Sequence, residues 1–309
     1  MSKSDKINPK LGEELKAVLT SASFKKRHVL HAVIASFIFL VLWTPYRYLT
    51  PILISKGISI RSLDSLVKPL VKSGIVISCL RFLDRIPKNR YMQELGIRRK
   101  GLLKGIVYGA VTWLLYTLTL QCSTLYFVGG GAIHPRLRLT ISDPIEYFLD
   151  LWYYILIVGL FEELLARGYI LREFYKGIKL KFRGILSIIA SGFLFSLFHL
   201  PIDVYVMKLG LVTILFHLLF SFSFSILAGY LFIRSGWHLA SVIVLHGMMD
   251  VKPFFSLIPP NVQPPGTGKE SVYEFFLSIL VPIISIEGMH RGRGRADKFK
   301  NAFLAKIKA

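Results

Sequence analysis

Acidic residues and cysteines are scarce in this chain, and each shortage excludes whole classes of protein. The 309 residues include 18 Asp or Glu against 39 Lys or Arg, so the formal net charge is +21. Cys79 and Cys122 are the only cysteines and both lie in apolar segments, which argues against a disulfide framework or a cysteine-based metal site. The polar residues 1–10 lack the pattern of a cleavable signal peptide, so we expect the first apolar segment to remain as an anchor.

The excess of positive charge does not indicate a nucleic-acid-binding protein. The sequence contains no nucleic-acid recognition motif, and its Lys and Arg residues cluster in particular loops and tails. This distribution is typical of the cytosolic loops of membrane proteins, where the same side chains also contact anionic lipid. We therefore expect membrane lipids, and no nucleic acid, as partners.

Apolar residues make up 53% of the chain, and they are arranged in long runs. Several runs reach about 18 residues, which is the length that crosses a bilayer. We predict an all-α fold, a polytopic transmembrane bundle of about eight membrane helices. The predicted segments are 29–46, 62–83, 105–128, 144–169, 184–200, 209–233, 237–250 and 272–286. Segment 62–83 contains Lys68, Pro69 and Lys72, so we expect it to be tilted or partly interfacial.

The two ends of the chain differ in composition from the bundle. Residues 1–28 form the predicted cytosolic N-terminal segment, in which residues 10–22 have the pattern of an amphipathic surface helix. The bundle covers residues 29–290, and residues 291–309 form a basic tail with a similar amphipathic pattern. Eight crossings place both termini on one side, and the basic loops assign that side to the cytosol of a protein integral to the cell membrane.

Two adjacent glutamates follow the apolar run 147–160, which only Asp150 interrupts. A charge at membrane depth costs at least about 2.5–3.5 kcal/mol, so such groups usually have a function. Glu163 and Arg167 are four residues apart and should pair on one helix face. Glu162 points away from that face and is the predicted reactive carboxylate. The alternative is a helix end at which both glutamates reach cytosolic water.

Further ionisable groups occur in later apolar segments. His199 ends segment 184–200, whereas His246 and Asp250 lie four residues apart in segment 237–250, so we expect Asp250 to orient or charge His246. His217 has no partner in the sequence pattern, and we predict a structural role for it. The remaining histidines lie at segment ends, in loops or in tails and have no predicted role: His28, His31, His134, His238 and His290.

Carboxylates and histidines on three helices predict one common site. The set is Glu162, Glu163, His199, His246 and Asp250. Such groups in a dry cavity suit general-base activation of water. They also suit zinc, with Glu162, His199 and His246 as ligands, and the residues alone leave metal dependence open. The metalloprotease motif H-E-x-x-H does not occur in the sequence.

The three motifs resemble those of the CPBP group of intramembrane endopeptidases, which includes the type II CAAX prenyl proteases and the Abi proteins. The E-E-x-x-x-R motif of that group corresponds to residues 162–167, and F-x-x-x-H corresponds to residues 195–199. The last motif, H-x-x-x-N or H-x-x-x-D, corresponds to residues 246–250. The resemblance covers about residues 145–250 and implies an intramembrane endopeptidase.

The resemblance also implies roles for individual residues. Glu162 and His199 would activate a water molecule, and His246 with Asp250 would stabilise the oxyanion. The best-known prenyl-protease members carry Asn at the position of Asp250. An ionised Asp cannot donate a hydrogen bond, so we expect Asp250 either to be protonated or to orient His246. The predicted substrate is a membrane-associated protein or peptide, and its prenylation stays open.

The predicted reaction is peptide-bond hydrolysis without a covalent intermediate, with Glu163 and Arg167 holding the site together. Two other classes of function remain open from the sequence. One is a non-catalytic immunity or scaffold protein of the same family, and the complete set of motif residues argues against it. The other is a transporter, although the sequence contains no inverted repeat and no matched pair of broken helices.

Overall fold

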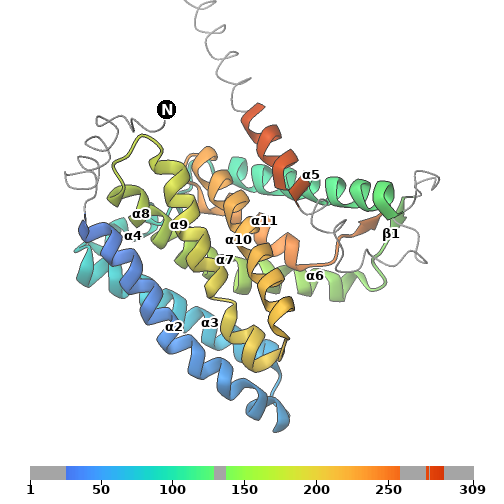
Figure 1. The fold of residues 1–309 in the computed structure, drawn as a ribbon, viewed down its shortest axis with the longest axis horizontal. Coiled ribbons are helices and arrows are strands. Elements are labelled where there is room, and N and C mark those ends of the chain that lie inside the picture. Colours follow the sequence, from blue (N-terminus) through green and yellow to red (C-terminus); the bar gives the residue numbers. More distant parts are fainter. Residues whose placement is uncertain (1–25, 129–136, 258–275, 278, 289–309) are drawn as a thin grey trace, which may run out of the picture.

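The computed structural model describes residues 26–128, 137–257, 276–277 and 279–288. The predicted amphipathic helix 10–22 and the basic tail 291–309 lie outside these residues and stay predictions. Within the described residues the chain is almost entirely helical (Figure 1). The single pair of strands in that part is short: β1 (Arg138–Leu139) runs antiparallel to β2 (Phe255–Ser256).

The described part of the chain starts with two long antiparallel helices. These are α2 (Lys26–Ser55) and α3 (Ile60–Ser78), and the short π-helix η1 (Cys79–Leu83) continues α3. The turn between them contains Gly57 at a φ of +83°, a conformation that glycine adopts without steric cost. Arg27 donates to the backbone oxygen of Leu83 at 2.7 Å, so the end of η1 returns to the start of α2.

The next helices are η2 (Lys88–Arg90), α4 (Tyr91–Glu94) and α5 (Leu102–Val128). The side chain of Gln121 on α5 donates to the backbone oxygen of Phe255 at 3.2 Å and accepts from the N–H of Leu257 at 2.7 Å. One buried amide therefore fixes the β2 segment against α5.

One continuous helix carries the centre of the chain from Pro144 to Gly177. Asp143 caps its first turn, because its carboxylate accepts from the N–H groups of Ile145 and Glu146 at 2.8 and 3.1 Å. Along the helix, α and π stretches alternate: α6 (Pro144–Tyr153), η3 (Tyr154–Gly159), α7 (Leu160–Glu163), η4 (Leu164–Leu171) and α8 (Arg172–Gly177). The helix therefore extends beyond the predicted segment 144–169. Its glutamates lie between two π-helical stretches, which occur frequently at functional sites.

The predicted stop of the fifth segment at Pro201 is wrong. Helix α9 (Arg183–Leu197) gives way to a turn, and helical backbone then continues through Pro201 into η5 (Ile202–Val206). Pro201 is tolerated because it lies in the first turn of the second helical stretch, where a backbone N–H would have no partner within the helix. The resulting element spans 24 residues from Arg183 to Val206.

The last long helices are α10 (Leu211–Arg234) and α11 (Leu239–Asp250). Helix α10 lies antiparallel to α9, and α11 packs between α5 and η3 (Figure 1). A Cβ atom on Gly247 of α11 would lie 2.5 Å from Cγ1 and 2.6 Å from Cα of Ile155. The absence of a side chain at Gly247 therefore permits the close approach of α11 and η3.

Four helices in the described part of the chain are long and apolar enough to cross a membrane. They are Lys26–Ser55, Leu102–Leu125, Arg183–Val206 and Leu211–Arg234. Two apolar helices are shorter, Leu239–Asp250 and Ile279–Gly288. These findings support an integral membrane protein with a helical bundle, whereas the predicted count of about eight membrane helices is not confirmed.

Candidate active site

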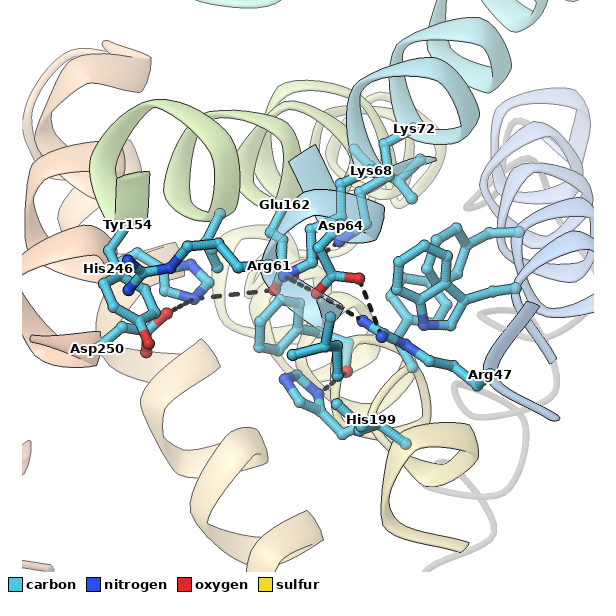
Figure 2. A pocket seen from close by; sticks show the side chains of 18 of the residues that line it. Arg47, Arg61, Asp64, Lys68, Lys72, Tyr154, Glu162, His199, His246 and Asp250 are labelled. Atoms are coloured by element: carbon cyan, nitrogen blue, oxygen red, sulfur yellow. Dashed lines mark hydrogen bonds and ion pairs between the residues drawn. The ribbon is translucent and has the colours of Figure 1, made fainter. Parts of the chain in front are cut away.

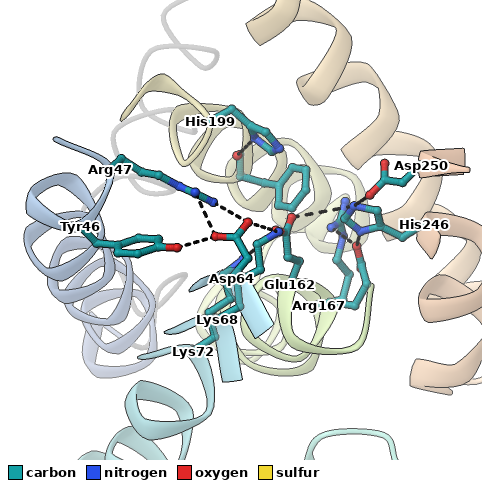
Figure 3. Close-up of polar contacts among 12 residues, drawn as sticks. Tyr46, Arg47, Asp64, Lys68, Lys72, Glu162, Arg167, His199, His246 and Asp250 are labelled. Atoms are coloured by element: carbon teal, nitrogen blue, oxygen red, sulfur yellow. Dashed lines mark hydrogen bonds and ion pairs between the residues drawn. The ribbon is translucent and has the colours of Figure 1, made fainter. Parts of the chain in front are cut away.

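Glu162 lies on α7 and forms ion pairs with two lysines of α3. Its Oε1 atom forms ion pairs with Nζ of Lys68 at 3.1 Å and with Nζ of Lys72 at 2.9 Å (Figure 3). The two lysines are four residues apart on α3, so both point from the same helix face toward Glu162. Their ammonium groups compensate the charge of a carboxylate whose side chain is only 12% exposed.

Glu163, the neighbouring carboxylate, holds the centre of the site together. Its Oε1 atom accepts from Nη1 of Arg167 at 2.7 Å, which is the pair that their spacing predicts. Arg167 also donates to the hydroxyl of Ser225 on α10 at 2.8 Å, and its guanidinium lies 4.3 Å from the ring centroid of Phe195. Both charged side chains are fully buried, so this ion pair fastens three helices to one another.

His246 has two carboxylate partners, the one expected from its own helix and a closer one that the sequence pattern did not reveal. The Nδ1 atom of His246 lies 2.6 Å from Oε1 of Glu163, whereas Oδ2 of Asp250 lies 3.6 Å from Nε2. An ionised carboxylate only accepts, so Nδ1 carries the proton of this hydrogen bond. The packing of α11 against α7 therefore adds a shorter contact at Nδ1 to the longer contact at Nε2 that the spacing within α11 predicted.

The Nε2 atom of His246 faces the acidic groups of the site. It lies 3.8 Å from Oε2 of Glu162, the oxygen opposite the one that the lysines contact. Asp250 approaches the same nitrogen from α11. Glu162 thus has one oxygen in ion pairs and one directed toward His246.

His199 reaches the site from the turn after α9. Its Nδ1 atom donates to the backbone oxygen of Phe195 at 3.0 Å, so Nε2 is left to face outward from α9. The ring of His217 lies edge-on to that of His199 at 5.5 Å between centroids, and Nδ1 of His217 lies 2.8 Å from Oδ1 of Asp203. His217 therefore lies beside the predicted site, in a pair with Asp203 that the sequence pattern did not reveal.

A cavity of about 500 Å³ connects these side chains (Figure 2). Among the residues that line it are Lys68, Lys72, Glu162, His199, His246 and Asp250. A smaller cavity of about 100 Å³ is lined in part by His199, His217, His246 and Asp250. The structure thus brings Glu162, His199, His246 and Asp250 to one cavity, with Glu163 and Arg167 buried behind His246.

Sequence reasoning did not predict that charged residues on α2 and α3 line the cavity. Asp64 accepts from the Tyr46 hydroxyl at 2.6 Å, pairs with Arg47 at 3.0 Å and lies 3.6 Å from Lys68. Asp64, Lys68 and Lys72 repeat every four residues within an apolar segment. That repeat was the available signal, because charges inside such a segment usually face one another within the bundle.

The residues Glu162, His199 and His246 do not fit a zinc ion, the option that the sequence left open. Two ammonium groups contact Oε1 of Glu162, and their charge opposes a divalent cation at that carboxylate. Among the described residues, one group of His, Asp and Glu side chains has its potential ligand atoms within 4.8 Å of one another, and that group does not include these three residues. We therefore derive no step through a metal ion at this cavity.

Comparison with protein families matches the central part of the chain. Residues 144–251 match the family model described as type II CAAX prenyl endopeptidase Rce1-like. No curated protein matches the chain. The matched residues include every predicted site residue from Glu162 to Asp250, whereas Lys68 and Lys72 precede them.

Proposed function

We propose that the protein hydrolyses a peptide bond in a membrane-associated protein, since residues 144–251 match the model of the Rce1-like type II CAAX prenyl endopeptidases. The observation that carries this proposal is the convergence of Glu162, His199 and His246 on one cavity between helices. A carboxylate and two imidazoles supply a base and a donor, which is what amide hydrolysis by water requires.

Glu162 is the proposed general base. Its Oε2 atom accepts a proton from a water molecule that the Nε2 atom of His199 helps to position. The hydroxide adds to the substrate carbonyl carbon and forms a tetrahedral oxyanion. Glu162 then delivers the proton to the amide nitrogen, the C–N bond breaks, and the products are a carboxylic acid and an amine. No covalent enzyme intermediate forms.

His246 is the proposed stabiliser of the oxyanion. Its Nδ1 proton is held by Glu163, and in the imidazolium form its Nε2–H points into the cavity beside Asp250. One such donor in a water-poor site contributes about 2.7–4 kcal/mol to the transition state. Glu163 and Arg167 act as positioning residues, because Glu163 contacts His246, Arg167 contacts Glu163, and neither side chain lines the cavity.

The experiment uses the purified full chain in detergent micelles and peptides that end in Cys-aliphatic-aliphatic-X, in farnesylated and unmodified forms. Glu162→Gln should lower the cleavage rate at least about a thousandfold, because an amide cannot accept the proton. Glu146→Gln on the exposed start of α6 is the matched control and should leave the rate unchanged. Equal rates for Glu162→Gln and the native chain would exclude Glu162 as the base.

The ion pairs of Glu162 also favour a second candidate function. A carboxylate fixed by two ammonium groups can serve a purely structural purpose in a non-catalytic membrane scaffold. A scaffold would cleave neither form of the peptide, and its cellular phenotype would follow the amount of folded protein in the Glu162→Gln variant. A protease would lose that phenotype even where the folded variant accumulates to the native level.

The proposal includes an orientation in the cell membrane with the start of α2 in the cytosol. The basic loop 84–104 and the residues after α8 lie at the same end as that start (Figure 1). A test uses chains without Cys79 and Cys122 that carry either Lys56→Cys or Lys88→Cys, both at exposed sites. An impermeant maleimide should label Lys56→Cys in intact cells and Lys88→Cys only after permeabilisation. The reverse result would invert the orientation.

A further inference from the structure

A second cluster of ionisable side chains lies at the end of the bundle where α2 begins. It consists of His28 and His31 on α2, Asp84 immediately after η1, and Glu173 on α8. One potential ligand atom from each of the four residues lies within 4.8 Å of the other three. Residues from three distant parts of the sequence thus meet at one point.

Three of the four side chains are almost completely withdrawn from solvent. The exposed fractions are 8% for His31, 4% for Asp84 and 1% for Glu173, against 26% for His28. Two carboxylates buried side by side repel each other unless a positive charge compensates them. His28 leaves one side of the cluster open to solvent, so an ion could enter there.

The inner contacts already have the arrangement of a ligand shell. The Nδ1 atom of His28 lies 2.7 Å from Oε2 of Glu173, and Nδ1 of His31 lies 2.7 Å from Oδ1 of Asp84. Nδ1 of His31 is also 3.9 Å from Oε2 of Glu173. Two nitrogens and two oxygens therefore face a common centre.

The outer oxygen of each carboxylate has a different partner. The Tyr169 hydroxyl donates to Oδ2 of Asp84 at 2.8 Å, and Nζ of Lys176 donates to Oε1 of Glu173 at 2.9 Å. The hydrogen bond from the neutral Tyr169 hydroxyl orients the Asp84 carboxylate and leaves its inner oxygen for the ion. Lys176 also adds a positive charge that opposes a cation.

We propose that His28, His31, Asp84 and Glu173 bind one divalent transition-metal ion, with zinc as the best match. Two imidazole nitrogens and two carboxylate oxygens suit the tetrahedral coordination of zinc, and the two carboxylates balance its charge. On binding, each Nδ1 proton moves to Nε2 of the same ring, so both histidines stay neutral. The ligand atoms then surround the ion at about 2.0–2.2 Å.

This site is separate from the proposed active site. Glu162 and Glu173 lie on the same continuous helix, and eleven residues of rise place them on the order of 16 Å apart. The ion would connect α2, the end of η1 and α8, so its role is to fasten the basic end of the bundle. The proposal therefore does not depend on whether the cavity hydrolyses peptides.

The test measures zinc binding by the full chain in detergent, after removal of metal with a chelator, by competition with a fluorescent zinc indicator. The native chain should bind one zinc ion. His28→Ala should weaken binding at least about tenfold, because it removes one of four ligands. Lys176→Met should tighten binding about threefold or more, because it removes a repelling charge from Glu173.

A double variant, His199→Ala with His246→Ala, separates this site from the cavity. It should keep the zinc affinity of the native chain, and loss of binding would assign the ion to the cavity instead. The proposal is overturned if the native chain binds no zinc, or if His28→Ala and Lys176→Met both bind zinc as the native chain does. The Lys176→Met measurement keeps the test decisive should His28→Ala fold poorly.

Discussion

The Nδ1 atom of His246 donates to Oε1 of Glu163 at a distance of 2.6 Å, and the two side chains are only 6% and 0% exposed to solvent. The same oxygen accepts from Arg167, so one buried carboxylate fixes both a cation and an imidazole. Asp250 lies farther from His246, at 3.6 Å from Nε2. The proposed donor is therefore positioned mainly by Glu163, whereas Asp250 lines the cavity, where it can contact substrate.

The first prediction contrasts these two carboxylates. Glu163→Gln should abolish cleavage and lower the free energy of unfolding by about 3–5 kcal/mol, because Arg167 loses its buried counter-charge. Asp250→Asn should keep cleavage within about tenfold of the native rate, because the amide can still contact His246 and can donate to an oxyanion. Peptide cleavage and thermal unfolding in detergent measure both effects. Equal losses in the two variants would contradict the assignment.

The second prediction concerns the coupling between Glu162 and Lys72, whose charged atoms are 2.9 Å apart. Lys72→Met should destabilise the fold by about 3–5 kcal/mol, because it removes one charge of a buried pair. Combining it with Glu162→Gln should recover part of that loss. A double-mutant cycle of unfolding free energies measures the coupling, and Lys56→Met at an exposed loop is the control. Additive effects would mean that the two groups do not interact.

Interactions within one helix could be predicted from the sequence, because helical spacing alone determines them. The pair Glu163–Arg167 and the long helix that ends at Gly177 are of this kind. Motif order also predicted that Glu162, His199 and His246 share a site, and they line one cavity. Their catalytic roles stay predictions.

Interactions between helices could not be predicted in the same way. The partners of Glu162 come from α3 and that of His246 from α7, and these pairs depend on how the helices pack. Lys68 and Lys72 seemed to make their segment a poor membrane helix, whereas in the fold each pairs with Glu162. Charged residues inside apolar segments indicated where the site lies, but they did not indicate which side chains pair with one another.

The third prediction tests the close contact between α11 and η3. Gly247→Ala should lower the free energy of unfolding by about 1–3 kcal/mol, because the added Cβ would lie 2.6 Å from the Cα atom of Ile155. It should also slow cleavage, since His246 precedes this residue. Gly74→Ala is the matched control, because its Cβ would meet nothing within 4 Å. An unchanged unfolding temperature for Gly247→Ala would show that the helices separate without cost.

The fourth prediction compares the stability contributions of two ion pairs near the cavity, one buried and one exposed. Asp64 pairs with Arg47 at exposures of 9% and 2%, whereas Asp150 pairs with Arg61 at 31% and 48%. Asp64→Asn should destabilise the fold by about 3–5 kcal/mol, because it leaves a buried guanidinium without a counter-charge. Asp150→Asn should cost at most about 1 kcal/mol, because water already screens that pair. Chemical denaturation of both variants in the same detergent measures the difference, and similar costs would show that water reaches Arg47.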